Sequence, residues 1–294
     1  MTSFSHSIIL ASCFIFLSNS KSEEEFYKMD EMTRLFSPSC WVPGKSRDEV
    51  MNEFFAGIRE AYDSLMSNDT IQKDLDIPYG PDENQKVDVY GDVKDNLLIF
   101  FHGGYWVEGD RKYCLTPVPA TLDSGFAFAS MGYGLATNDR NLSDCVSDAV
   151  KGVEFLLQKY PNISNIYIGG HSAGAHLAFQ AAVKVRNPRI KGLLLFAGVY
   201  FLEELVGTEI GNAINLTIDQ AKLNSCDPTL SDGMFLMKTF FVGGLEAPKL
   251  IEQNVEFVKG RRGILKQFPH LSHYTLMTQM WNDYSMIKYG LGVE

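Results

Sequence analysis

The sequence contains too little positive charge for several classes of function. Lysine and arginine total 26 against 36 aspartate and glutamate residues, so the formal net charge is −10. This acidic balance argues against a nucleic-acid partner and against a polybasic attachment to a membrane surface. The chain also has no CxxC pair, no His/Cys cluster of the kind that binds a metal, and no internal repeat. The sequence therefore offers no candidate metal site.

Long apolar runs are absent as well. The uncharged apolar segment Ile8–Leu17 is too short to span a bilayer comfortably, and small or polar residues (Ser18, Asn19, Ser20) follow it. The segment is typical of a signal-peptide core, so residues 1–20 are predicted to be a cleaved signal. The mature chain would then have no stable membrane span and would be secreted or lie in the lumen of the secretory pathway. Because no lysine or arginine precedes Ile8, a cytoplasmic chain remains the alternative.

Cysteine is scarce, with five residues in the whole chain. Loss of the signal would remove Cys13 and leave Cys40, Cys114, Cys145 and Cys226. Four cysteines are compatible with two disulfides in an oxidising compartment or with four unpaired buried thiols, and the spacing leaves both open. Four N-x-S/T triplets fall in expected loops or at element ends, where a glycan can be tolerated: Asn68, Asn141, Asn162 and Asn215.

The chain is rich in features of a mixed helix and strand fold. Hydrophobic residues make up 45% of its 294 residues, which is enough for a large core. Helices are expected at 23–36, 48–66, 142–160, 173–185 and 275–289. Short apolar runs indicate strands at 87–90, 97–101, 126–131, 166–168, 193–196 and 235–242. The alternation predicts a single α/β domain over residues 21–294, with a mostly parallel sheet covered by helices on both faces.

The segment Gly170–Gly174 fits the pattern G-x-S-x-G with Ser172 at its centre. An expected strand enters the motif and an expected helix leaves it, which is the strand–turn–helix setting that exposes a nucleophilic serine. The helix N-terminus also directs backbone N–H groups toward the reacting centre. We predict that Ser172 is the nucleophile. The alternative is an ordinary glycine-rich turn with a capping serine.

A second glycine motif, His102-Gly103-Gly104, directly follows the expected strand 97–101, about 70 residues before Ser172. Acyl transfer needs donors for the oxygen that becomes negative, and backbone N–H groups serve best where no side chain crowds them. We assign these donors to Gly103, Gly104 and Ala173. A plain glycine turn is the alternative, but the two motifs in this order and spacing favour a hydrolase.

In the fold with this nucleophile turn, the acid and then the histidine follow the serine in the chain. Glu246 is the sole carboxylate between the expected strand 235–242 and the next helix, so we predict that it orients the base. Two histidines, His270 and His273, fit the order, and their spacing does not separate them. His273 lies immediately before the expected helix 275–289 and is preferred, which leaves His270 as a polar loop or pocket-wall residue. Together these residues indicate a serine hydrolase of the α/β-hydrolase fold.

Several segments then resemble animal kynurenine formamidase (arylformamidase). The HGGYW segment (102–106) and the GHSAGAHL segment (170–177) are similar to the family's motifs. Shorter likenesses occur in FSPSCW (36–41), IPYG (77–80) and LTIDQA (216–221) with Asn224-Ser225. The resemblance runs from about residue 24 to the C-terminus. An HGG-x-W segment is shared more loosely with related esterases. The form with tyrosine at the variable position, HGGYW, combined with GHSAGAHL is more specific to the kynurenine formamidase family.

The resemblance implies hydrolysis of N-formyl-L-kynurenine to L-kynurenine and formate in tryptophan catabolism, without a cofactor. It also implies that Tyr105 and Trp106 provide an aromatic wall for the substrate, although both residues could instead only support the sheet edge. The family's acid loop, G-x-x-D-S-P, here reads GGLEAP (243–248), so Glu246 replaces aspartate. The family's His-Phe pair matches His273-Tyr274. The signal-like N-terminus also departs from the family, whose typical members are intracellular.

Two other functions remain compatible with the sequence. A secreted carboxylesterase or lipase-like enzyme would use the same catalytic groups on esters, and residues alone do not separate these substrates. A non-catalytic binding protein of the same fold is the second alternative. Such proteins usually lack the serine, the histidine or the acid, whereas this chain has all three.

Overall fold

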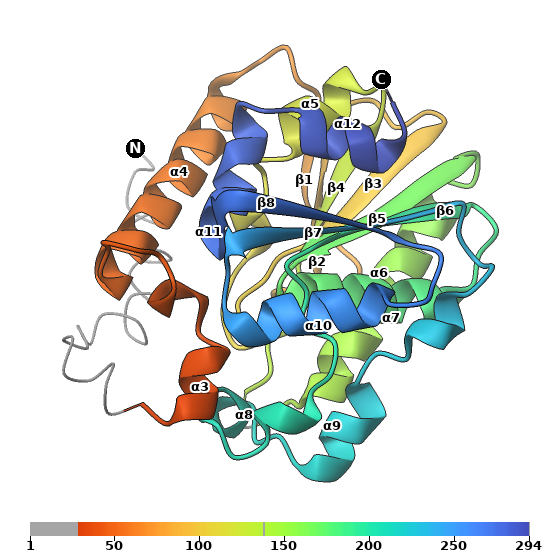
Figure 1. The fold of residues 1–294 in the computed structure, drawn as a ribbon. Coiled ribbons are helices and arrows are strands. Elements are labelled where there is room, and N and C mark those ends of the chain that lie inside the picture. The colour runs from red at the N-terminus through yellow and green to blue at the C-terminus, as the bar shows by residue number, and fades with distance from the viewer. Residues whose placement is uncertain (1–28, 138, 294) are drawn as a thin grey trace.

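The computed structural model describes residues 29–137 and 139–293. The expected signal at 1–20 and the beginning of the expected helix at 23–36 lie outside the described residues. The described chain forms an eight-stranded sheet in the order β1-β2-β4-β3-β5-β6-β7-β8 (Figure 1). Strands β1 and β2 and strands β2 and β4 pair antiparallel, and all other neighbours pair parallel. The predicted mostly parallel sheet is therefore confirmed.

The strands and helices have the following bounds. The strands are β1 (Lys73–Pro78), β2 (Lys86–Tyr90), β3 (Asn96–Phe101), β4 (Ala127–Met131), β5 (Asn165–His171), β6 (Ile190–Phe196), β7 (Met237–Leu245) and β8 (Ile264–Ser272). The α-helices are α3 (Glu31–Leu35), α4 (Arg47–Ser67), α5 (Val118–Asp123), α6 (Leu142–Lys159), α7 (Ala173–Val185), α8 (Glu209–Ala213), α9 (Ile218–Asn224), α10 (Pro248–Val258), α11 (His273–Thr278) and α12 (Ser285–Leu291). The 3₁₀ turns are η1 (Pro38–Cys40), η2 (Arg111–Tyr113), η3 (Glu203–Leu205), η4 (Pro228–Ser231) and η5 (Gln279–Trp281).

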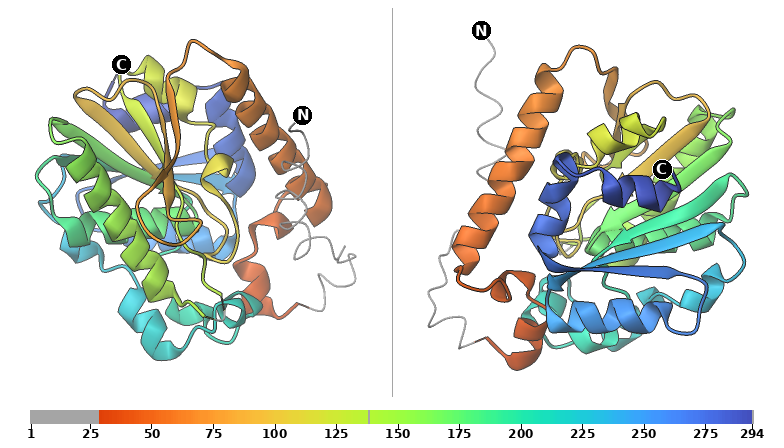
Figure 2. Two further views of the ribbon diagram at one scale, coloured as in Figure 1. Left: turned by 180° about the vertical axis from the view of Figure 1, so that it is seen from behind. Right: turned by 45° about the horizontal axis from the view of Figure 1, so that its top comes forward.

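The sheet has a hydrophobic core on each face. Alternate residues of β3 point to opposite faces, so Ile99 and Phe101 join one core while Leu98 and Phe100 join the other. Helices α6, α7 and α10 cover the first face, and α5, α11 and α12 cover the second (Figures 1 and 2). Helix α4 runs beside α11 and contacts it. Burial on both faces explains why β3 reads as a continuous apolar run.

Two strands were missing from the sequence prediction. Both lie at the edges of the sheet, where one side of each strand pairs with no neighbour. The sequence of β1 (KDLDIP) is charged and mostly exposed, and β8 (ILKQFPHLS) mixes polar and apolar residues without alternation, is partly exposed and contains Pro269. Edge strands tolerate charge and proline because half of their backbone groups bond to no neighbouring strand. Neither segment therefore shows the apolar pattern that identifies a buried strand.

The expected helix at 275–289 is also different in the structure. It divides into α11, the turn η5 and α12, with residues 282–284 between the last two. The Asp283 side chain accepts a hydrogen bond from the Ser285 N–H at 2.9 Å, which favours a local turn over a continuous helix. His273 is thus the first residue of α11 and does not precede the helix.

The four described cysteines are unpaired, so the two-disulfide possibility is wrong. Cys114, Cys145 and Cys226 are buried, and burial raises the pKa of the Cys114 and Cys145 thiols to about 12. Among the helices that the structure describes, none has the length and apolar character needed to cross a bilayer.

Candidate active site

Ser172 lies at the sharp turn between β5 and α7. Its backbone has φ 58° and ψ −123°, a region that non-glycine residues rarely occupy. The turn requires small neighbours, because a Cβ atom added at Gly170 would lie 2.3 Å from the Gly174 carbonyl oxygen. A Cβ atom added at Gly174 would lie 2.1 Å from the Phe101 carbonyl oxygen. The glycines of the motif therefore permit the close contact between the turn, α7 and β3.

The loop after β3 brings Gly103 against this turn. A Cβ atom added at Gly103 would lie 3.0 Å from Ser172 Cβ and 3.0 Å from the His171 carbonyl oxygen. Gly104 has φ +108°, a conformation that side chains disfavour, and a Cβ atom there would meet the Glu108 carbonyl oxygen at 2.2 Å. Ala173 is the first residue of α7 and is fully buried. The three predicted N–H donors thus lie in the two segments that meet at Ser172.

Strand pairing brings the acid and the base together. Leu245 at the end of β7 pairs with Ser272 at the end of β8, so the next residues of the two strands, Glu246 and His273, become neighbours. The Nδ1 atom of His273 lies 2.7 Å from Glu246 Oε2, and the N–H of Ala247 donates to Glu246 Oε1 at 2.7 Å. The other candidate, His270, is exposed on β8, away from this pair.

Both members of the pair are buried, with exposed fractions of 4% for His273 and 3% for Glu246. Burial lowers the pKa of His273 to about 3, so that the ring favours its neutral form. Burial raises the pKa of Glu246 well above its ordinary range, and the bond from the Ala247 N–H opposes this shift.

His171, which precedes the serine, supports the backbone of the base. Its Nε2 atom lies 3.0 Å from the His273 carbonyl oxygen, and the two imidazole ring centres are 4.3 Å apart. Since a carbonyl oxygen can only accept, Nε2 carries the proton of this bond. Burial lowers the pKa of His171 well below its ordinary value, so the ring is neutral and does not place a cation beside His273.

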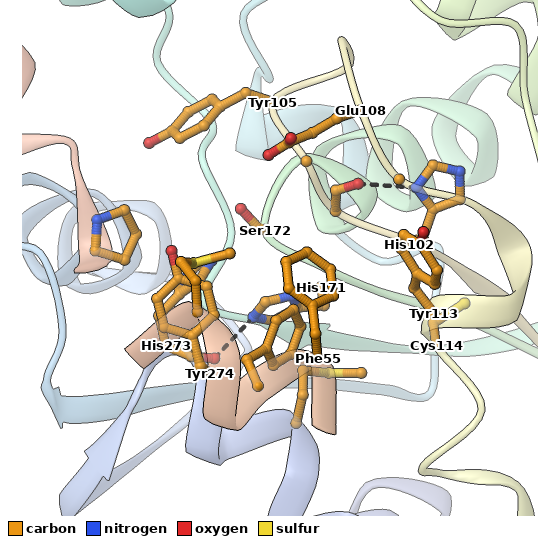
Figure 3. A pocket seen from close by; sticks show the side chains of 17 residues that line it. Phe55, His102, Tyr105, Glu108, Tyr113, Cys114, His171, Ser172, His273 and Tyr274 are labelled. Carbon is orange, nitrogen blue, oxygen red and sulfur yellow. Dashed lines mark hydrogen bonds between the residues drawn. The ribbon is translucent and has the colours of Figure 1, made fainter. Parts of the chain in front are cut away.

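Ser172 and His273 line one cavity, shown from close by in Figure 3. Strands β3, β5 and β8 end at this cavity, as expected for a site at the carboxyl ends of parallel strands. Much of its wall is aromatic: Phe54, Phe55, Tyr113 and Tyr274. The ring centres of Phe54 and Tyr274 are 5.0 Å apart, and those of Phe55 and Tyr113 are 5.8 Å apart. Helix α4 thus closes one side of the cavity with aromatic side chains.

In the part of the chain that the structure describes, no group of three or more His, Cys, Asp or Glu side chains is arranged to hold a metal ion.

Comparisons with known proteins agree with this architecture. The family model BD-FAE matches residues 87–204, a range that contains both glycine motifs. A kynurenine formamidase of Danio rerio is 28% identical over 275 residues, which cover 86% of this chain and 92% of the relative. A kynurenine formamidase of Salmo salar is also 28% identical, over 88% of this chain and 94% of the relative. The chain is a kynurenine formamidase-like hydrolase.

Solved structures show the same fold for this kynurenine formamidase-like hydrolase. A protein described as a thioesterase from Silicibacter sp. tm1040 superposes with a TM-score of 0.72 at 20% identity, covering 87% of this chain and 98% of its own. The hyperthermophilic esterase of the archaeon Pyrobaculum calidifontis superposes with a TM-score of 0.63 at 16% identity, covering 83% and 92%. The predicted α/β-hydrolase fold is confirmed.

Tyr105 and Trp106, the two residues predicted to form an aromatic wall for the substrate, lie in different places. Tyr105 lines the cavity, and its hydroxyl donates to the Phe36 carbonyl oxygen at 2.6 Å. Trp106 is fully buried, makes an edge contact with His176 at 5.1 Å and does not line the cavity. The structure thus places Trp106 in the core against His176 and not on the cavity wall where it was expected.

Sequence reasoning missed the aromatic residues of α4 and the loop residue Glu108, all of which line the cavity. Phe54 and Phe55 lie about 120 residues before Ser172, in a segment whose pattern of apolar residues resembles that of any amphipathic helix. A useful signal was present for Glu108, since it lies four residues after Gly104 in the predicted donor loop.

Proposed function

We propose that this chain hydrolyses N-formyl-L-kynurenine to L-kynurenine and formate, with Ser172 as nucleophile, His273 as base and Glu246 as the residue that orients the base. One observation carries the proposal: the hydrogen-bonded Glu246–His273 pair meets the strained Ser172 turn at a cavity with an aromatic wall. The similarity to kynurenine formamidases over most of the chain supports the choice of substrate.

The first half of the reaction forms an acyl-enzyme. Ser172 Oγ attacks the formyl carbon while His273 Nε2 takes the hydroxyl proton, and Glu246 accepts the hydrogen bond from Nδ1–H of the resulting imidazolium. The formyl oxygen becomes negative and accepts hydrogen bonds from the N–H groups of Gly103 or Gly104 and of Ala173. Losing one such donor typically raises the barrier by about 2.7–4 kcal/mol.

The second half releases both products. His273 returns its proton to the aryl nitrogen, the C–N bond breaks, and the aromatic amine leaves a formyl ester on Ser172. A water molecule then gives a proton to His273 and attacks the ester carbon. Collapse of that intermediate returns the proton to Ser172 Oγ and releases formate.

The cavity wall suits the leaving group more than the acyl group. A formyl group carries only hydrogen, so it needs little room beside Gly103. The leaving group is an aromatic ring, which the side chains of Phe54, Phe55, Tyr113 and Tyr274 can contact by face or edge. Their residues come from α4, η2 and α11, so the wall does not depend on Trp106.

The experiment that tests this proposal compares kcat/KM for N-formyl-L-kynurenine with kcat/KM for short aryl esters. A formamidase is expected to prefer the formamide. A value for the formamide no better than for generic esters would contradict the assignment and favour a carboxylesterase.

We also propose that the chain enters the secretory pathway, because the uncharged apolar run at 8–17 followed by small and polar residues is typical of a cleaved signal. Intact-mass measurement of protein collected from the medium of expressing cells tests this. Loss of about the first 20 residues is expected, whereas a full-length protein retained in the cytoplasm would contradict it.

A further inference from the structure

Glu108 is a carboxylate in the catalytic cavity with no role in the proposed triad. It lies in the same loop as Gly103 and Gly104, and Figure 3 shows its side chain and that of Ser172 on the wall of one cavity. Within residues 29–137 and 139–293 its carboxylate has neither a hydrogen-bond nor an ion-pair partner. Burial raises its pKa, because the charged form loses contact with water.

A tight turn fixes the position of this side chain. The N–H groups of Val107 and Glu108 both donate to the Gly104 carbonyl oxygen at 3.1 Å. A Cβ atom added at Gly104 would lie 2.9 Å from Glu108 Cγ, so the glutamate stem packs directly over the glycine. The Trp106 carbonyl oxygen, which accepts from the Ala136 N–H at 2.7 Å, ties the same turn to the core. Glu108 is therefore held beside the predicted oxyanion donors.

The cavity offers no positive charge to pair with Glu108. Among the described residues that line it there is no lysine or arginine. The lining histidines, His102, His171 and His273, all have a pKa lowered by burial and are neutral at neutral pH. Arg111, three residues after Glu108, is bound instead to Asp88 at 2.9 Å. A cationic group of a bound molecule could therefore pair with this carboxylate without competing with a protein side chain.

We propose that Glu108 binds a primary ammonium group of the substrate, so that the enzyme selects aryl formamides with a cationic side chain. The inference rests on the proposed function and narrows its substrate class. An N-formylkynurenine molecule carries one ammonium and one carboxylate on its side chain, and Glu108, the charged side chain among the described lining residues, can pair only with the ammonium. An aryl formamide with an amine but no carboxylate should be an equal or better substrate, and one whose sole charge is a carboxylate should be poor.

The test uses the variant Glu108→Gln, which keeps the shape of the side chain and removes its charge. Two pairs of substrates are measured, aryl formamides and aryl esters, each with a side chain ending in a primary amine or in a neutral amide of similar length. Glu60→Gln is the matched control, because Glu60 is exposed on α4 and does not line the cavity. Both variants change the net charge of the protein equally.

The expected result is a loss of roughly 10- to 100-fold in kcat/KM for the amine-bearing substrates of Glu108→Gln, in line with a lost charge-assisted hydrogen bond. The neutral substrates should change little, which also shows that the variant is folded. Glu60→Gln should behave as the wild type. An equal loss for both members of a pair, or no loss for either, would overturn the proposal.

The two substrate pairs keep the two hypotheses apart. If the wild type cleaves only the esters, the formamidase assignment fails, and the ester pair still decides whether Glu108 recognises an ammonium group. If the formamides are cleaved but their charge makes no difference, the formamidase assignment stands and the role of Glu108 is wrong.

Discussion

Substituting alanine for Gly103 should slow the reaction without unfolding the protein. The φ of Gly103 is not positive, so an alanine can adopt the backbone conformation, but its Cβ atom would lie 3.0 Å from Ser172 Cβ and from the His171 carbonyl oxygen. These neighbours must yield by a few tenths of an ångström. Because a misplacement of about 1 Å can reduce the rate about 100-fold, we expect kcat to fall roughly 10- to 100-fold. That loss corresponds to about 1.4–2.7 kcal/mol of activation free energy.

The assay is steady-state hydrolysis of N-formyl-L-kynurenine, measured together with thermal unfolding. The matched control is Gly125→Ala, at a glycine with φ +77° and no atom within 4 Å of an added Cβ. That variant should lose about 1 kcal/mol of stability through backbone strain and keep its kcat. If Gly103→Ala keeps the wild-type kcat, the proposed position of the oxyanion donors is wrong. The same holds if the fraction of unfolded protein accounts for the whole loss of activity.

Three further predictions concern the proposed catalytic residues. Ser172→Gly should be more stable than Ser172→Ala by about 1 kcal/mol, because glycine relieves the strained φ of 58°; equal unfolding free energies in urea would contradict this. Glu246→Ala should lower kcat by roughly 1,000-fold or more, and an unchanged rate would point to another carboxylate. In Glu246→Gln the residual kcat/KM should persist to lower pH than in the wild type, because burial already lowers the pKa of His273 and the amide, unlike the carboxylate, cannot stabilise the imidazolium. The base acts when neutral, so a lowered pKa extends activity toward acid, and an unmoved acid limb of the pH profile would refute the reasoning.

The sequence predicted the centre of the fold well because burial there enforces simple patterns. The apolar runs at 87–90 and 97–101 match β2 and β3 within one residue, and the helix expected at 173–185 matches α7 fully. Chain order and strand position also pointed to Glu246, and chain order limited the base to His270 or His273. The 2.7 Å contact between Glu246 and His273, however, depends on the pairing of β7 with β8, a strand that the sequence did not reveal.

The substrate wall could not be predicted for a related reason. It is built from segments distant in the chain, with Phe54 on α4 meeting Tyr274 on α11. No local pattern indicates that a helix near the N-terminus will lie over a turn near residue 172. Trp106 shows the converse, since a residue of the predicted donor loop lies in the core while the neighbouring Tyr105 lines the cavity.

The most direct test of the central claim is the release of L-kynurenine and formate from N-formyl-L-kynurenine by the purified protein and by Ser172→Ala, measured side by side. We predict equimolar release of the two products by the wild type and a loss of at least about 1,000-fold in the folded variant, because the triad members act as a unit. A folded variant that keeps more than a few per cent of the activity, or a wild type that releases neither product, would contradict the assignment.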